Sequence, residues 1–203
     1  MAEFLALPSP IPPLRFDRGR AQVWEPGHNL TNFTVVQIGA RQRANRWTRE
    51  GWRAICRHLL EQLETVVVTC GPGHDEIEQA EWLQRQLGLR VLCTKGQATW
   101  PQMADLLYRA RLYVGPNTAA MHLAAACGCP VIALFGPSIE DNWYPWQTPH
   151  RIVTSRAFIP SDGDLERYAQ IQKRSMGEIR ADDVIAACAA LLASSARRVP
   201  TSP

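Results

Sequence analysis

Residues 115–130, GPNTAAMHLAAACGCP, contain the residue types of an anion-binding site. Asn117 or Thr118 can cap a helix that begins here, and the two alanines that follow would let a ligand come close to the backbone. The free N–H groups of a first helical turn and the helix dipole together attract a phosphate. His122 could donate a hydrogen bond to that phosphate. A capped core helix with a hydrogen-bonded histidine is the alternative interpretation, and the spacing alone favours it.

The loop GARQRANRW, residues 39–47, is a second candidate for phosphate binding. Gly39 permits a tight turn, and Arg41, Arg43 and Arg46 gather positive charge in a form suited to bidentate phosphate contacts. A solvated basic loop is the alternative interpretation.

A third candidate is the turn CGPG, residues 70–73, whose glycines could let a ribose or a base approach, although by itself it is only a turn signal. The sequence contains no GxGxxG motif, no P-loop, no Cys/His nucleophile arrangement and no acidic metal cluster. Dinucleotide oxidoreduction and ATP hydrolysis are therefore disfavoured.

Composition and charge point to a globular protein that does not bind nucleic acid. The 203 residues suffice for one ordinary domain, and the net charge of +3 is too small to indicate a nucleic-acid partner. Six cysteines in mostly apolar surroundings predict free thiols in a reducing compartment. The start lacks a secretory signal, and the apolar stretch 119–136 reads as a helix and a strand separated by a Gly-Cys-Pro break. These features predict a cytoplasmic protein.

Alternating strand and helix patterns predict an α/β fold with a doubly wound, mainly parallel sheet. Strands are expected at 34–38, 65–70, 90–94, 111–115 and 131–136, with an edge strand at 151–155, and helices at 49–63, 74–87, 103–110, from about 118, and at 180–193. Residues 1–32 look like a linker, 33–195 form the domain, and 196–203 look like a disordered tail. Ligands of such sheets bind beyond the carboxyl ends of the strands, where the three candidate segments lie.

In this order and spacing, the segments resemble the C-terminal, donor-binding domain of glycosyltransferase family 9, the group of ADP-heptose:lipopolysaccharide heptosyltransferases. The resemblance covers roughly residues 34–193. It is carried by Gly39, Ala40, Arg46, Trp47 and Trp52, by Gly71-Pro72-Gly73, by Asn117-Thr118 and Met121 to Ala126, and by Gly128, Pro130 and Ala133 to Pro137.

The resemblance implies a Rossmann-like domain of a two-domain GT-B enzyme. Such an enzyme is inverting and metal-independent, needs no cofactor, and moves a sugar from a nucleotide diphosphate, ADP-heptose by family expectation, to a lipid-linked saccharide at the inner face of the bacterial inner membrane. The acceptor site and the catalytic base belong to an N-terminal domain, so no catalytic residue is expected in this chain. Either the chain is a fragment, or a separate chain supplies the missing half.

The binding residues implied by the family fall into two groups. Donor and phosphate binding is expected from Gly39, Ala40, Arg43, Asn45, Arg46, Asn117, Thr118, Ala119, Ala120, Met121 and His122, and nucleoside binding from Gly71, Pro72, Gly73, Gln97 and Ala98.

Three positions depart from the family pattern. Asn45 stands where members usually carry a lysine that neutralises donor phosphate, Gln37 replaces a frequent histidine, and Asn117-Thr118-Ala119 replaces Asp-Thr-Gly. Loss of a preorganised group that stabilises leaving-group charge can cost roughly 3–4 kcal/mol. A non-catalytic nucleotide-sugar-binding module or pseudo-enzyme subunit is therefore the alternative, and an epimerase or other GT-B-like enzyme is a third possibility.

Overall fold

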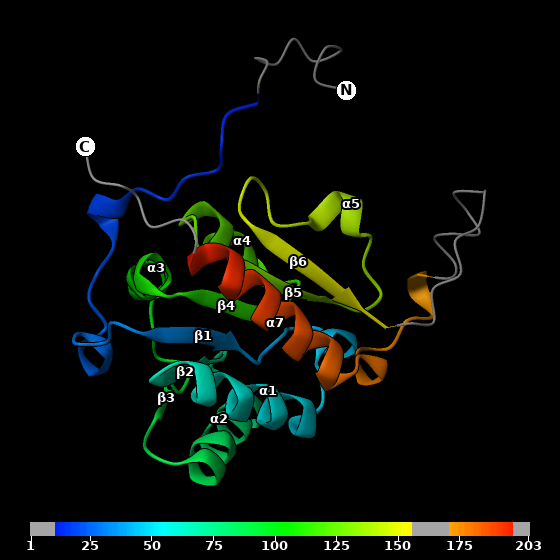
Figure 1. Ribbon diagram of the computed structural model, residues 1–203, viewed down its shortest axis with the longest axis horizontal. Coiled ribbons are helices and arrows are strands. Elements are labelled where there is room, and N and C mark those ends of the chain that lie inside the picture. Colours follow the sequence, from blue (N-terminus) through cyan, green and yellow to red (C-terminus); the bar gives the residue numbers. More distant parts are fainter. Residues whose placement is uncertain (1–10, 156–170, 197–203) are drawn as a thin grey trace.

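A six-stranded sheet in which all strands run parallel forms the centre of the molecule (Figure 1). The computed structural model describes residues 11–155 and 171–196. The strands lie in the order β3-β2-β1-β4-β5-β6. Their bounds are β1 Phe33–Gln37, β2 Thr65–Thr69, β3 Val91–Cys93, β4 Leu112–Pro116, β5 Val131–Phe135 and β6 His150–Thr154.

Helices cover both faces of this sheet. They are α1 Arg49–Gln62, α2 His74–Leu87, α3 Trp100–Arg109, α4 Ala119–Ala126, the short α5 Glu140–Trp143 and α7 Ala181–Ala196, with single 3-10 turns at Arg18–Arg20, Glu25–Gly27, Arg43–Asn45 and Met176–Glu178. Successive strand residues point to opposite faces, so the side chains of the sheet contribute to two separate apolar cores, one on each face. Val36 belongs to the core beneath α1, α2 and α7, whereas its neighbour Val35 belongs to the core beneath α3 and α4.

The predicted fold class is confirmed, and each predicted strand is present within a residue or two of its expected ends. The apolar stretch 119–136 forms α4 followed by β5, as its Gly-Cys-Pro break indicated. Among the residues that the structure describes, no helix is both long and apolar enough to cross a bilayer. All six cysteines are free thiols.

The N-terminal segment, expected to be a linker because of its prolines and glycines, packs against the helices from about residue 16 onward. The Phe16 N–H donates to the Ala126 carbonyl at the end of α4, and Trp24 is buried in the core. The Arg109 guanidinium donates to the carbonyls of Gly27 and Leu30. Residues 1–10 and the expected tail at 197–203 lie outside the described residues.

Candidate functional site

A cleft of about 1000 Å³ crosses the carboxyl edge of the sheet and is lined by the segments that follow β1 to β5. Because the strands are parallel, all these segments emerge at the same edge, where ligands of α/β sheets bind. The predicted binding residues that line the cleft are Gly39, Ala40, Asn45, Gly71, Pro72, Ala98, Asn117, Thr118, Ala119, Ala120 and His122.

Five predicted site residues do not line the cleft: Arg43, Arg46, Gly73, Gln97 and Met121. Met121 is fully buried in the core beneath α4, on the side of the helix that faces the sheet. Arg43 is exposed in the 3-10 turn that precedes α1. Of the three arginines in this loop, Arg41 is the one that lines the cleft.

Arg46 is held by protein groups instead of being free for a phosphate. Its Nε donates to the Ala40 carbonyl at 2.9 Å, and one terminal nitrogen pairs with Glu76 Oε1 at 3.2 Å. The other terminal nitrogen lies 3.7 Å from Asp75. The guanidinium thus connects the loop after β1 to the start of α2.

Glu76 completes this connection between two loops of the cleft. Its Oε2 accepts the Gly71 N–H at 2.7 Å, while its Oε1 accepts from Arg46. A Cβ at Gly39 would lie 1.8 Å from the same Oε2, so only glycine allows the carboxylate to pass at this point. The Glu76 side chain is 12% exposed, so its contacts are shielded from water more than those of a surface pair.

The N-terminus of α4 is open toward the cleft. Thr118 occupies the capping position, but its side chain accepts no hydrogen bond from the first turn. The N–H groups of Ala119 and Ala120 therefore remain available to a ligand, and both residues line the cleft. Such a helix start favours negative charge through its N–H groups and dipole.

His122 lies on the first turns of α4 and is half-buried. Burial lowers the pKa of His122 below its ordinary value, so the imidazole is neutral at pH 7. A neutral imidazole still donates one hydrogen bond, which suits contact with a phosphate oxygen. Its ring centroid lies 6.2 Å from that of Trp143 on α5.

Gln37 anchors the end of β1 beneath the cleft. Its side-chain amide donates to the Gly39 carbonyl at 3.1 Å, and its oxygen accepts from the Thr69 hydroxyl at 2.7 Å. The position that departs from the family's histidine therefore joins the ends of two neighbouring strands, β1 and β2.

Two thiols lie together where β2 and β3 end. The Cys70 thiol hydrogen-bonds to the Cys93 sulfur, which raises the pKa of Cys70 and lowers that of Cys93. The Lys95 N–H also donates to the Cys93 sulfur, at 3.3 Å. Of the two cysteines, Cys70 lines the cleft.

Sequence reasoning missed several residues of the cleft, among them Glu76, Trp100, Ser138 and Trp143. Trp100 begins α3, which follows β3, and Trp143 ends α5, which follows β5. The signal that could have found both is their place one short loop beyond a strand, at the edge where ligands bind.

The two tryptophans of the expected motif have a structural role. Trp47 and Trp52 are buried and meet edge to face, with ring centroids 5.0 Å apart. The Trp47 indole donates to the Ile179 carbonyl at 3.0 Å, just before α7. These residues pack α1 and α7 against the sheet below the cleft.

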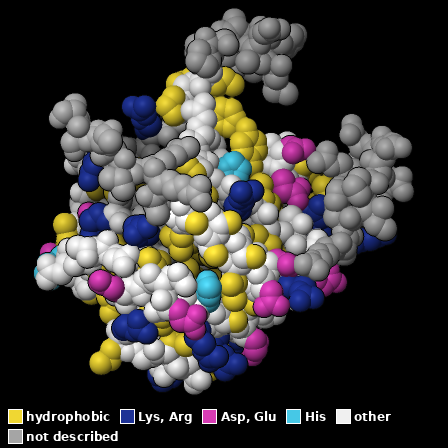
Figure 2. All heavy atoms as spheres, in the orientation of Figure 1, with side chains coloured by type: hydrophobic (Ala, Val, Ile, Leu, Met, Phe, Trp, Pro, Cys, Tyr) yellow, Lys and Arg dark blue, Asp and Glu magenta, His cyan; other side chains and the backbone are white. Residues whose placement is uncertain are grey.

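Charged side chains on the face shown in Figure 2 include both signs, with acidic groups interspersed among the Lys and Arg side chains. Within residues 11–155 and 171–196, no group of three or more His, Cys, Asp or Glu side chains could hold a metal ion.

A doubly wound parallel sheet with an open helix N-terminus and glycine turns at its carboxyl edge is an arrangement typical of nucleotide-binding domains. Residues 8–167 match the sequence profile described as glycosyltransferase family 9 (heptosyltransferase). The chain belongs to this family.

Two relatives agree with this assignment, and a solved structure shares the fold. Two proteins named lipopolysaccharide heptosyltransferase 3, from Escherichia coli K12 and from Escherichia coli, are 30% and 31% identical over 81% and 91% of the chain. The chain spans 48% and 54% of their lengths, about half of each. The structure of E. coli ADP-heptose lps heptosyltransferase II has the same fold, with a TM-score of 0.72 at 22% identity, over 95% of this chain and 57% of that one.

Proposed function

We propose that this chain is the donor-binding domain of a glycosyltransferase, and that its cleft holds a nucleotide-diphosphate sugar. The observation that carries the proposal is the open N-terminus of α4, which follows β4 and lies between the two ends of a cleft that crosses five strands. ADP-heptose is the donor we propose, since similar proteins are named as heptosyltransferases and one solved relative is named for ADP-heptose.

In this proposal the diphosphate lies against the first turn of α4. The N–H groups of Ala119 and Ala120 and the imidazole of His122 donate to its oxygens, and Arg41 adds positive charge from the loop after β1. Asn45 contributes a neutral amide at the position of the family's lysine. The nucleoside lies toward β2 and β3, against Gly71, Pro72 and Ala98.

These groups would stabilise the negative charge that develops on the nucleoside diphosphate as it leaves the sugar. Preorganised donors aimed at developing charge are among the largest contributions to catalysis. We propose an inverting reaction that needs no metal ion, because N–H groups and arginine meet the phosphate charge. The catalytic base and the lipid-linked saccharide acceptor are assigned to a second domain, carried by the same longer protein or by a separate chain, at the inner face of the inner membrane.

A non-catalytic nucleotide-sugar-binding module is the second candidate. Two observations favour it: Asn45 lacks the charge of the lysine, and Arg46 is engaged by Glu76 and Ala40. Both reduce the positive charge available to a leaving diphosphate, while they leave the N–H groups of α4 intact.

Calorimetric titration of the chain with ADP, UDP, GDP and CDP tests nucleotide binding and base preference. Product formation from ADP-heptose and a lipid acceptor, with the second domain added, separates the enzyme from the binding module. Nucleotide binding without transfer by the reunited protein would favour the module. Absence of binding to all four nucleotides would refute both.

A further inference from the structure

The cleft has a direction that follows from the strand order. Loops after five adjacent strands, spaced about 4.8 Å apart, span about 19 Å, which is long enough for an extended nucleotide sugar. The open α4 N-terminus, which suits the diphosphate, follows β4 and so lies between the two ends. The two ends differ in chemistry.

Most of the β3 end is formed by backbone and apolar side chains, with Thr94 and Glu76 as polar lining residues. Gly71, Pro72, Gly96, Ala98 and Met103 line it, and a flat, poorly hydrated base fits these surfaces. The β5 end is formed by polar and aromatic groups, Ser138, His122 and Trp143. With the base at the β3 end and the diphosphate at the start of α4, we expect the donor sugar to extend toward β5.

Trp143 is placed at this end in an exposed position. Trp143 is 54% exposed although tryptophan is a large apolar residue, and it is part of neither hydrophobic core. An indole left in contact with water at the edge of a cleft offers a large flat surface that a ligand can cover. The C–H groups on one face of a pyranose ring pack well on such a surface.

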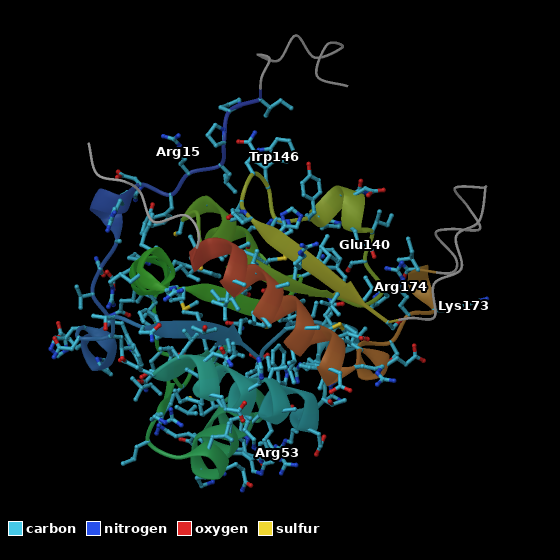
Figure 3. The ribbon with its side chains drawn as sticks, viewed as in Figure 1. Arg15, Arg53, Glu140, Trp146, Lys173 and Arg174 are labelled. Atoms are coloured by element: carbon cyan, nitrogen blue, oxygen red, sulfur yellow. The ribbon has the colours of Figure 1, made fainter. Side chains whose placement is uncertain are left out.

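The element that carries Trp143 is held in place by a partly buried ion pair. A helix of four residues has no stability of its own, so α5 needs tertiary anchoring. Glu140, its first residue, pairs with Arg174, whose side chain is 3% exposed (Figure 3). The Gln172 side chain donates to the Pro137 carbonyl at 3.4 Å and ties the same two segments together.

We propose that Trp143 forms the platform on which the sugar ring of the nucleotide-sugar donor stacks, and that the Glu140–Arg174 pair positions this platform. The inference rests on the proposed function, and it assigns the sugar end of the cleft to a residue outside the predicted site. The β5 end of the cleft, with Trp143, then selects among donors by the shape of the sugar, whereas the β3 end selects among them by the base.

Calorimetric titration of the chain with ADP and with ADP-heptose tests the assignment, because the two ligands differ only in the sugar. Trp143→Ala is expected to weaken the binding of ADP-heptose about 5-fold, which is the size of one aromatic contact. The affinity for ADP should change by less than about 2-fold. Trp143→Phe should keep most of the ADP-heptose affinity. Trp100→Ala is the matched control, since this indole is 55% exposed at the other end of the cleft and should weaken both ligands equally.

Three outcomes would overturn the proposal: equal affinity of the unmodified chain for ADP and ADP-heptose, a Trp143→Ala variant that binds ADP-heptose normally, or one that loses both ligands to the same extent. Each of these leaves nucleotide binding, and hence the proposed function, intact. Failure of the unmodified chain to bind any nucleotide would refute the proposed function and this inference together.

Discussion

Among the charged residues of the cleft, Glu76 is the one whose replacement we expect to lower the stability of the chain most. Replacing it with glutamine keeps the size of the side chain and an oxygen that can still accept the Gly71 N–H, but removes the charge that holds Arg46. Hydrogen bonds to charged groups contribute about 1.5–3 kcal/mol each. Because Arg46 is 30% exposed, water screens part of this attraction. We therefore expect Glu76→Gln to lower the free energy of unfolding by about 1–2 kcal/mol.

Glu78 supplies a matched control on the same helix. It pairs with Arg49 at 3.0 Å, but the two side chains are 53% and 41% exposed. Exposed pairs of this kind are worth roughly 0–1 kcal/mol, so Glu78→Gln should change stability by less than about 0.5 kcal/mol. Only the Glu76 variant should also lower the affinity for ADP, because it loosens the loops that begin at Gly39 and Gly71.

Urea unfolding at pH 7 measures both variants through the midpoint concentration, and calorimetry measures their ADP affinity. Equal shifts of the midpoint for Glu76→Gln and Glu78→Gln would refute the reasoning, because they would show that burial of the Glu76 contacts adds nothing. An unchanged ADP affinity in Glu76→Gln would show that the two loops keep their geometry without the carboxylate.

Four further perturbations test the proposals. Asn45→Lys should strengthen ADP binding about tenfold in calorimetry by placing a cation beside the diphosphate, and unchanged affinity would contradict this. Ala119→Glu should abolish ADP binding by repulsion at the start of α4, with a normal urea midpoint because the position is exposed. Burial lowers the pKa of His122 in the folded chain, so stability should fall as pH drops below its unfolded value of about 6.5. A bound phosphate opposes this shift, so ADP affinity should rise between pH 8 and pH 6, and should not do so in His122→Ala. EDTA should leave ADP affinity unchanged, and a strict Mg²⁺ requirement would sink the metal-independent proposal.

Local pattern was a reliable guide to the fold. The strands expected at 65–70 and 131–136 form β2 and β5, each paired on both sides. Their apolar runs, Val66 to Val68 and Val131 to Phe135, are fully buried, as expected of strands covered on both faces. Gly39, Gly71 and Thr118 follow three different strands of this parallel sheet, and all three line one cleft at its carboxyl edge, as the sequence predicts.

Side-chain partners could not be read from the same pattern. Arg46 was expected to bind phosphate because of its type and position in the loop, yet its guanidinium is held by Ala40 and Glu76. Met121 matched a family motif but turns into the core because of its angular position on α4. Both outcomes depend on groups 6 to 30 residues away or on a packed helix face, so no local spacing encodes them.

The sequence by itself determined the fold class, the strand and helix segments, and the loops expected at the carboxyl edge, because periodicity and glycine placement act within a few residues. Only the tertiary structure decided which side chains face the cleft and which are engaged in hydrogen bonds or ion pairs with other protein groups. It also decided where the exposed indoles of Trp100 and Trp143 lie. The physical reason is that a charge or a ring gains its role from the groups packed against it. Those groups come from α2, α5 and the segment before α7, which only folding brings to the same edge.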